Sequence, residues 1–264
     1  LRTLKKESID TTLWMLKTLR YILEKHAQVK VHEVLNEEAS SLFARNKEQG
    51  IKHTTAYAFQ SLFNSCGITE LCLDLVAQGI DNNLCLEGLK LFVILLWRRG
   101  GNEEVQRSIH TYLLETDSIQ FFEQIKELLE FMMLFSQRES EVKSAEEDLM
   151  MRALANYSKA IDNTHTRRNN KKKGKDSIEK DTVNRLPDES VVLKLIQLMC
   201  EGSLLLNCNI FREQDLNNTI VPILESLASY VDVLSTTNGL SSIYASTKAI
   251  HTIKKLIHGP CKGN

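Results

Sequence analysis

The sequence predicts an all-α protein, an armadillo- or HEAT-like helical solenoid of roughly ten helices. The chain has 264 residues but only 11 Gly and 3 Pro, too few for the turns of a β-sandwich or the loops of a βα repeat. Apolar residues recur every three or four positions over long segments, which indicates amphipathic helices. We find no repeat of fixed period, so the repeats of the solenoid would be degenerate.

The N-terminal helices each show one apolar face. Gly67 and Gly79 are expected to end two of them, because glycine readily adopts the left-handed conformation that closes a helix. The predicted ranges are Leu4–His26, Val31–Ala44, His53–Asn64 and Thr69–Gln78.

The segment Leu84–Arg99 is apolar almost all round, which predicts a central helix covered on several sides. Asp81 precedes it as a candidate N-cap, and two glycines follow it. Asn102 is expected to cap the next helix. We expect Leu84–Arg99 and Val191–Cys200 to form the core of the protein.

The helices of the second half are separated by one charged stretch. Asp117 is expected to cap a helix that reaches Met133, and a separate charged helix follows from about Glu139 to Ile161. Residues 163–188 lack the apolar side chains that offset ordering entropy, so we predict a disordered loop. Further helices are predicted over Val191–Met199, from Asn217 to Val231 and over Gly239–His258.

These elements divide the chain into three parts. Residues 1–162 form the N-terminal part of the solenoid, residues 163–188 the disordered charged loop, and residues 189–264 the C-terminal part of the same solenoid. The chain begins at Leu1 rather than Met and stops at Asn264 within a Gly-Pro-Cys turn. We therefore expect it to be a fragment of a larger protein.

Composition excludes several classes of function. The formal net charge of −1 gives no field that would favour nucleic acid or an anionic membrane. The longest apolar run, Leu89 to Trp97, is far below the roughly 20 residues that span a bilayer. No phosphate-binding loop, zinc-protease motif or nucleophile elbow is present, so we expect no enzyme.

The cysteines and charged runs have simple structural interpretations. Six cysteines without close paired spacing indicate reduced, buried thiols rather than disulfides. A zinc site would need a second close ligand pair besides His258 and Cys261, since Cys200 and Cys208 lie eight residues apart. The basic run from Arg167 to Lys175 resembles a nuclear-localisation or polyanion patch, but it lacks interleaved aromatic residues and is better explained as a solvated loop.

Three stretches together resemble one family, the inositol 1,4,5-trisphosphate receptors and ryanodine receptors. The first is the apolar helix from Leu84 followed by Gly-Gly-Asn-Glu-Glu-Val-Gln, ending at Gln106. The second is Leu198-Met-Cys-Glu-Gly with Phe211-Arg-Glu-Gln downstream, and the third is the turn Ile257-His-Gly-Pro-Cys-Lys-Gly-Asn. The resemblance covers about residues 68–264.

The resemblance implies the homology-associated, third armadillo-type domain of these intracellular calcium-release channels. Such a domain is cytosolic and carries ligand-induced movement towards the pore. It further implies a homotetrameric parent in the endoplasmic reticulum or another intracellular membrane. The partners of the segment would be other domains of the same polypeptide, with no nucleic acid and no membrane insertion by the segment itself.

The family's activating calcium site uses two glutamates, and by resemblance only one is present. Glu201 matches the first, whereas the second position is Lys255 and the family's nearby histidine is Ser203. Gly239 to Asn264 contains no Asp or Glu that a shifted register could supply. We therefore expect the calcium site to be degenerate, Ca²⁺ binding to be unlikely, and a Lys255–Glu201 ion pair to brace two helices in its place.

Two alternatives stay open at this point. Glu201 lies at the end of an apolar helix, where the helix dipole disfavours an acid, and it is simply explained as a solvated residue at a fraying end. The chain as a whole could be an armadillo-like protein-binding scaffold unrelated to channels.

Limited trypsin digestion tests the domain boundaries. We expect the first cleavages between Arg167 and Lys180, because a disordered, basic loop offers the protease both flexibility and cleavage sites. Mass spectrometry of the early fragments identifies the sites. Protection of this stretch would mean that the boundaries are drawn wrongly.

Overall fold

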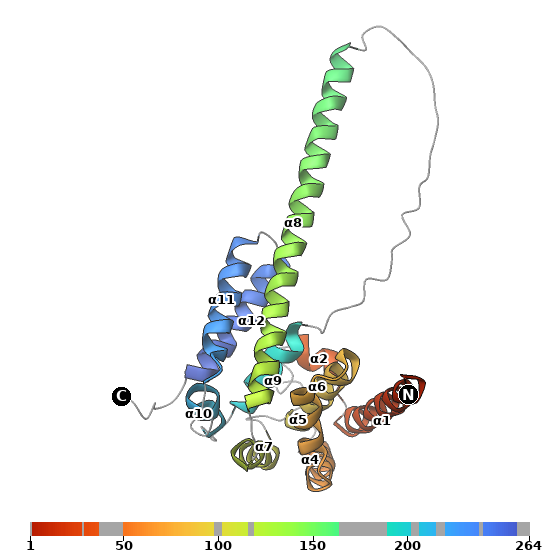
Figure 1. Cartoon of the computed structure of the whole chain (residues 1–264), viewed down its shortest axis with the longest axis vertical. Coiled ribbons are helices and arrows are strands. Elements are labelled where there is room, and N and C mark those ends of the chain that lie inside the picture. Colours follow the sequence, from red (N-terminus) through yellow and green to blue (C-terminus); the bar gives the residue numbers. More distant parts are fainter. Residues whose placement is uncertain are drawn as a thin grey trace.

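The computed structural model describes residues 2–27, 29–36, 50–97, 102–115, 119–163, 189–201, 206–214, 220–237 and 240–257. These residues form helices and connecting turns without any strand, so the predicted all-α class is confirmed. The helices stack side by side in a solenoid-like body (Figure 1). None of the described helices is both long and apolar enough to cross a bilayer.

The described helices of the first half lie close to their predicted positions. Residues 37–44 of the predicted Val31–Ala44 helix and residues 98–99 of the predicted Leu84–Arg99 helix lie outside the described residues. Gly67 and Gly79 have φ angles of 79° and 53°, the left-handed conformation expected at helix ends. The Asp81 carboxylate accepts hydrogen bonds from the backbone N–H groups of Asn83 and Leu84, which confirms it as an N-cap. The helices are α1 (Arg2–Ala27), α2 (Val31–Asn36), α4 (Gly50–Ser65), α5 (Ile68–Gln78), α6 (Asn82–Leu96) and α7 (Glu103–Glu115).

The second half differs from the prediction at three places. The helix predicted from Asn217 to Val231 begins only at Ile223, after Pro222, and runs to Thr236. The two helices predicted from Asp117 to Ile161 are one continuous helix, α8 (Ile119–Asn163), because no glycine or proline interrupts the segment. A short helix, α10 (Leu206–Glu213), was not predicted. The other helices are α9 (Glu189–Met199), α11 (Ile223–Thr236) and α12 (Leu240–Ile257). The predicted disordered loop lies outside the described residues, apart from Asn163.

The core is built around α6 and α9, as the sequence predicts. Leu89 and Phe92 of α6 and Ile196 of α9 have no solvent-accessible surface. The two helices pack against each other, α6 also packs against α1 and α5, and α9 against α12. Both helices therefore have neighbours on several sides, which is why they are apolar almost all round.

Helix α8 is buried only along its first half. Its inner part packs against α5 and α11, where Phe122, Ile125 and Leu129 are fully buried. Every described side chain from Gln137 to Arg152 is exposed. In Figure 1 this outer part of α8 rises well beyond the other helices.

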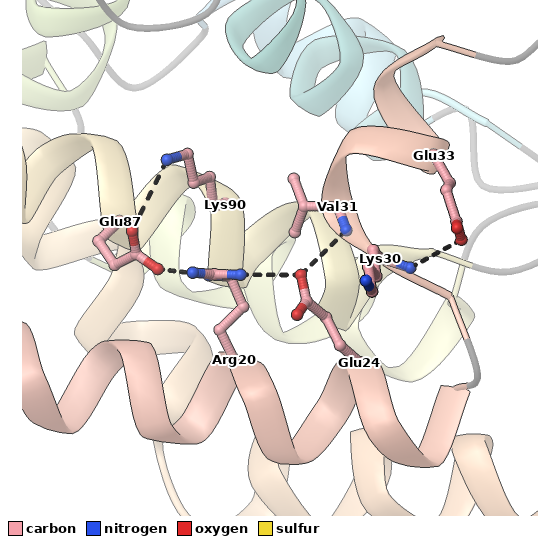
Figure 2. Close-up of polar contacts among 7 residues, drawn as sticks. All are labelled: Arg20, Glu24, Lys30, Val31, Glu33, Glu87 and Lys90. Atoms are coloured by element: carbon pink, nitrogen blue, oxygen red, sulfur yellow. Dashed lines mark hydrogen bonds and ion pairs between the residues drawn. The ribbon is translucent and has the colours of Figure 1, made fainter.

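A charge cluster joins α1 to α6 and α2 (Figure 2). Glu87 is only 4% exposed on the apolar helix α6, and the Arg20 guanidinium of α1 donates a hydrogen bond to it. Arg20 also donates to Glu24 Oε1 at 2.8 Å, and this oxygen accepts the Val31 backbone N–H of α2 at 3.0 Å. Lys90 Nζ lies 3.7 Å from Glu87 Oε2.

Burial lowers the pKa of Arg20, but its hydrogen bonds and charge interactions with Glu87 and Glu24 outweigh this effect and raise the pKa above its ordinary value. The guanidinium therefore stays charged at any physiological pH, and the buried Glu87 keeps a permanent counter-ion. Removing one partner of such a pair leaves an uncompensated charge, which is costly.

Replacing Arg20 by methionine tests this cluster. We expect Arg20→Met to lower the free energy of unfolding by about 1–3 kcal/mol, since Glu87 loses its closest hydrogen-bond donor. The matched control is Arg107→Met. Its ion pair with Glu103 measures 2.6 Å, but the two side chains are 67% and 55% exposed, so we expect a loss of about 0–1 kcal/mol. Equal losses in urea denaturation would contradict a special role for the Arg20 cluster.

Candidate functional site

The C-terminal end of α9 meets α7, α10 and α12 inside the protein. We call this place the α9 junction and define it by Gln106, Cys200, Glu201, Asn207, Cys208 and Lys255. The last carbonyl groups of any helix lack partners within the helix. Because Leu198 and Met199 are buried, donors for these carbonyls must come from neighbouring elements.

Two side-chain amides supply these donors. The Gln106 Nε2 of α7 donates hydrogen bonds to the carbonyl oxygens of Leu198 and Glu201, both at 2.7 Å. The Asn207 Nδ2 of α10 donates to the carbonyl of Met199 at 3.1 Å and to that of Gln106 at 3.2 Å. Gln106 and Asn207 are each 1% exposed, so water contributes little to this network.

A second amide network closes the end of α6. Gln60 Nε2 donates to the carbonyls of Ile94 and Trp97, at 2.8 and 2.9 Å. Asn102 Nδ2 in turn donates to Gln60 Oε1 at 3.0 Å. Asn102 Oδ1 accepts the Val105 backbone N–H at 3.4 Å, which is a long capping bond at the start of α7 and agrees with the predicted N-cap. One turn of α7 thus connects the ends of both core helices.

The ion pair expected from the sequence is present at the α9 junction. Lys255 Nζ of α12 lies 3.6 Å from Glu201 Oε1, just beyond the end of α9. The Lys255 side chain is 31% exposed and that of Glu201 18% exposed. At this distance the contact is an ion pair rather than a short hydrogen bond, and partial exposure limits its contribution to stability.

Helix α12 is held against α9 by a second polar contact. Gln197 Nε2 of α9 donates to Thr252 Oγ1 at 2.8 Å and to the Lys248 carbonyl at 3.2 Å. Thr252 has no exposed surface. Movement of α12 would therefore have to break or carry along contacts with α9 at two places.

Two thiols complete the junction. The Cys208 Sγ lies 3.7 Å from the carbonyl oxygens of both Cys200 and Lys255. A hydrogen bond with the Cys200 thiol lowers the pKa of Cys208 to about 7, burial opposes this change, and the charges of Arg212 and Lys255 support it. The same hydrogen bond, together with burial, raises the pKa of Cys200.

The other described cysteines differ. Burial raises the pKa of Cys72 and brings that of Cys85 to about 11. Cys66 is exposed. The five described cysteines are free thiols, and the prediction that they are buried is wrong for Cys66.

The structure brings Glu201 and Lys255 together but does not test the metal prediction. Among the described residues, no group of three His, Cys, Asp or Glu side chains could hold a metal ion. The other residues of the considered zinc site, His258 and Cys261, lie outside the described residues. Glu201 as a metal ligand stays a prediction.

The structural roles of Gln106 and Asn207 were not predicted. In the sequence, Gln106 stands out only as the end of the Gly-Gly-Asn-Glu-Glu-Val-Gln stretch. Its place beside Val105 and Ile109 on the apolar face of a helix could have indicated a buried polar contact. Asn207 was missed together with helix α10, which is too short to show a clear period.

Comparison with known protein families gives a match to the C-terminal part of the chain. Residues 189–264 match the family described as "RyR and IP3R Homology associated". This range contains α9 to α12, and with them Glu201, Cys208 and Lys255. No curated protein matches the chain significantly.

Substitution of Gln106 tests the α9 junction. We expect Gln106→Ala to lower the free energy of unfolding by about 1–3 kcal/mol, because two buried carbonyls lose their donor. The control is Gln137→Ala on the exposed part of α8, for which we expect a change within about 0.5 kcal/mol. Indistinguishable urea unfolding curves for the two variants would show that the buried amide does not stabilise the end of α9.

Proposed function

We propose that the chain is a helical module of an intracellular, ligand-gated calcium-release channel, because residues 189–264 match the RyR and IP3R homology associated family. Its work in this proposal is to transmit conformational change towards the pore. The observation that carries the proposal is the family match over the segment that contains the α9 junction. The matched family is not an enzyme family, and the proposed role needs no catalytic residue.

The packing of α9 supports a mechanical role. The helix contacts α6, α8 and α12, and side chains of α7 and α10 bind its last carbonyls. Closely packed elements change between discrete arrangements rather than deform continuously. A displacement of α12 would reach α9 through Gln197 and through the Glu201–Lys255 pair, and from α9 it would reach α6.

We further propose that this module does not sense calcium as its relatives do. Calcium takes about six to eight oxygen ligands, most of them from carboxylates and carbonyls. Glu201 instead faces the Lys255 ammonium at 3.6 Å, and a cation at that place repels Ca²⁺. In this proposal the ion pair is a permanent brace between α9 and α12, at the position where the relatives bind a metal.

The proposal also covers the oligomeric state, the location and the partners of the parent protein. The parent would be a homotetramer in the endoplasmic reticulum or another intracellular membrane, with this segment in the cytosol. Other domains of the same polypeptide would be its partners. Three isoleucines spaced by seven residues on the solvent face of α12 support such contacts: Ile243, Ile250 and Ile257, each more than half exposed.

The transcript that encodes the chain tests the channel assignment. A channel parent continues past Asn264 into further helices and then into several hydrophobic spans with a pore loop. Further solenoid repeats without such spans would favour the protein-binding scaffold and refute the assignment.

Calcium binding tests the proposed loss of the metal site. Calorimetric titration of the chain with Ca²⁺ should show no micromolar site, because an ammonium replaces one of the two carboxylates. Micromolar binding that disappears in Glu201→Gln would refute this loss.

Paired lysine variants test the brace itself. Lys255→Glu should lower the melting temperature without calcium, since two carboxylates then face each other, and millimolar Ca²⁺ should recover part of the loss. Lys254→Glu, on the exposed neighbouring residue, should show neither effect. Equal behaviour of the two variants would mean that Lys255 does not face Glu201 in solution.

A further inference from the structure

Cys200 and Cys208 lie next to each other at the α9 junction. Cys200 follows the last residue of α9, and Cys208 lies in the first turn of α10. The Cys208 sulfur lies 3.7 Å from the Cys200 carbonyl oxygen, and the Cys200 thiol is near enough to lower the pKa of Cys208. A disulfide between them would need both side chains to bring their sulfur atoms to about 2.05 Å, with the Cα atoms roughly 4.4–6.8 Å apart.

The surroundings favour the thiolate of Cys208 over that of Cys200. Arg212, one turn later on α10, and Lys255 of α12 both act on Cys208 as positive charges. These charges, together with the Cys200 hydrogen bond, give Cys208 a pKa of about 7. Cys72 and Cys85 lack this arrangement, because burial raises the pKa of each and no thiol contributes. Thiolate character is what makes one cysteine of a pair the first to react.

We propose that Cys200 and Cys208 are an oxidation site, which a small peroxide converts into a reversible disulfide between the end of α9 and α10. The inference does not depend on the proposed channel function. Cys208 is the attacking residue and Cys200 the resolving residue. Both are largely buried, at 1% and 6% exposure, so the oxidant must be as small as hydrogen peroxide and must enter through local opening.

The reaction balances in two steps. The Cys208 thiolate attacks one peroxide oxygen, the O–O bond breaks, and the products are a sulfenic acid and hydroxide. The Cys200 thiol then gives its proton to that hydroxide, and its sulfur attacks the Cys208 sulfur. The S–S bond forms as the S–O bond breaks, and the departing hydroxide takes up the proton that the Cys208 thiol released when it ionised. In total two thiols and one peroxide yield one disulfide and two waters, with two electrons passing from sulfur to peroxide.

The disulfide would fasten the junction covalently. It would close the short loop from Cys200 to Cys208, which contains Glu201. The end of α9 would then be tied to α10 by a bond as well as by the Asn207 amide. Cellular thiols would reverse the bond, since disulfides in reducing compartments are mostly transient.

Peptide mapping tests the proposal on the whole chain. The reduced protein is treated with hydrogen peroxide, quenched with catalase, alkylated with iodoacetamide and digested with trypsin. Cleavage after Lys194 and Arg212 releases the peptide Leu195–Arg212, which contains both cysteines and no other. After oxidation we expect this peptide to be lighter by two hydrogen atoms and to take up no alkyl group. After reduction of the disulfide, it should take up two alkyl groups, one on each cysteine. Oxidation of Met199 adds an oxygen and is distinguished by mass.

The rate and two variants sharpen the test. Disulfide formation should be about tenfold faster at pH 8 than at pH 6, following the thiolate fraction of Cys208. In Cys200→Ser the reaction should stop at a Cys208 sulfenic acid, which dimedone traps, whereas Cys66→Ser on the exposed cysteine should leave disulfide formation unchanged. The proposal is refuted if both cysteines of the wild-type peptide stay alkylatable while Cys66 is oxidised. Pairing of either cysteine with Cys66 or Cys261 would refute it as well.

Discussion

The buried C-terminal ends of α6 and α9 impose the main constraint on this structure. Both helices are apolar almost all round and lie inside the protein, so water cannot serve their last carbonyls. Side-chain amides take that place: Gln60 at the end of α6, and Gln106 with Asn207 at the end of α9. Because Asn102 also binds Gln60, one turn of α7 holds both ends. The positions of α4, α7 and α10 follow from this requirement.

Two ion pairs attach the outer helices to that core, and they differ in kind. Arg20 meets Glu87 in a largely buried cluster with several hydrogen bonds, so its loss would leave a charge without solvent. Lys255 meets Glu201 at 3.6 Å in a partly exposed place, with the two side chains 31% and 18% exposed, where water screens the charges more. The Arg20–Glu87 pair therefore contributes to the free energy of unfolding. The second pair bears more on the relative position of α9 and α12, on which the proposed transmission would depend.

Much of the fold could be predicted because its signals are local. Asp81 and Gly79 mark one end each of α6 and α5, whereas the Glu201–Lys255 ion pair was expected only from the family resemblance. The continuity of α8 could have been predicted, because no glycine or proline interrupts the segment, whereas the short α10 shows neither a clear period nor a deciding capping signal. The amide network and the thiol pair depend on contacts between distant segments. Gln106 and Leu198 are 92 residues apart, a relation that no periodicity reveals.

The outer half of α8 has a geometric consequence for the rest of the molecule. At about 1.5 Å per residue, the 26 residues from Arg138 to Asn163 extend roughly 39 Å. A tilt of about 5° where α8 leaves α11 would then displace the distant tip by roughly 3 Å, provided that the helix stays straight. Small rearrangements among packed side chains at the root are thereby converted into ångström-scale travel in solvent. A pair of spectroscopic labels, one on α11 and one near Asn163, would read such travel as a change in distance.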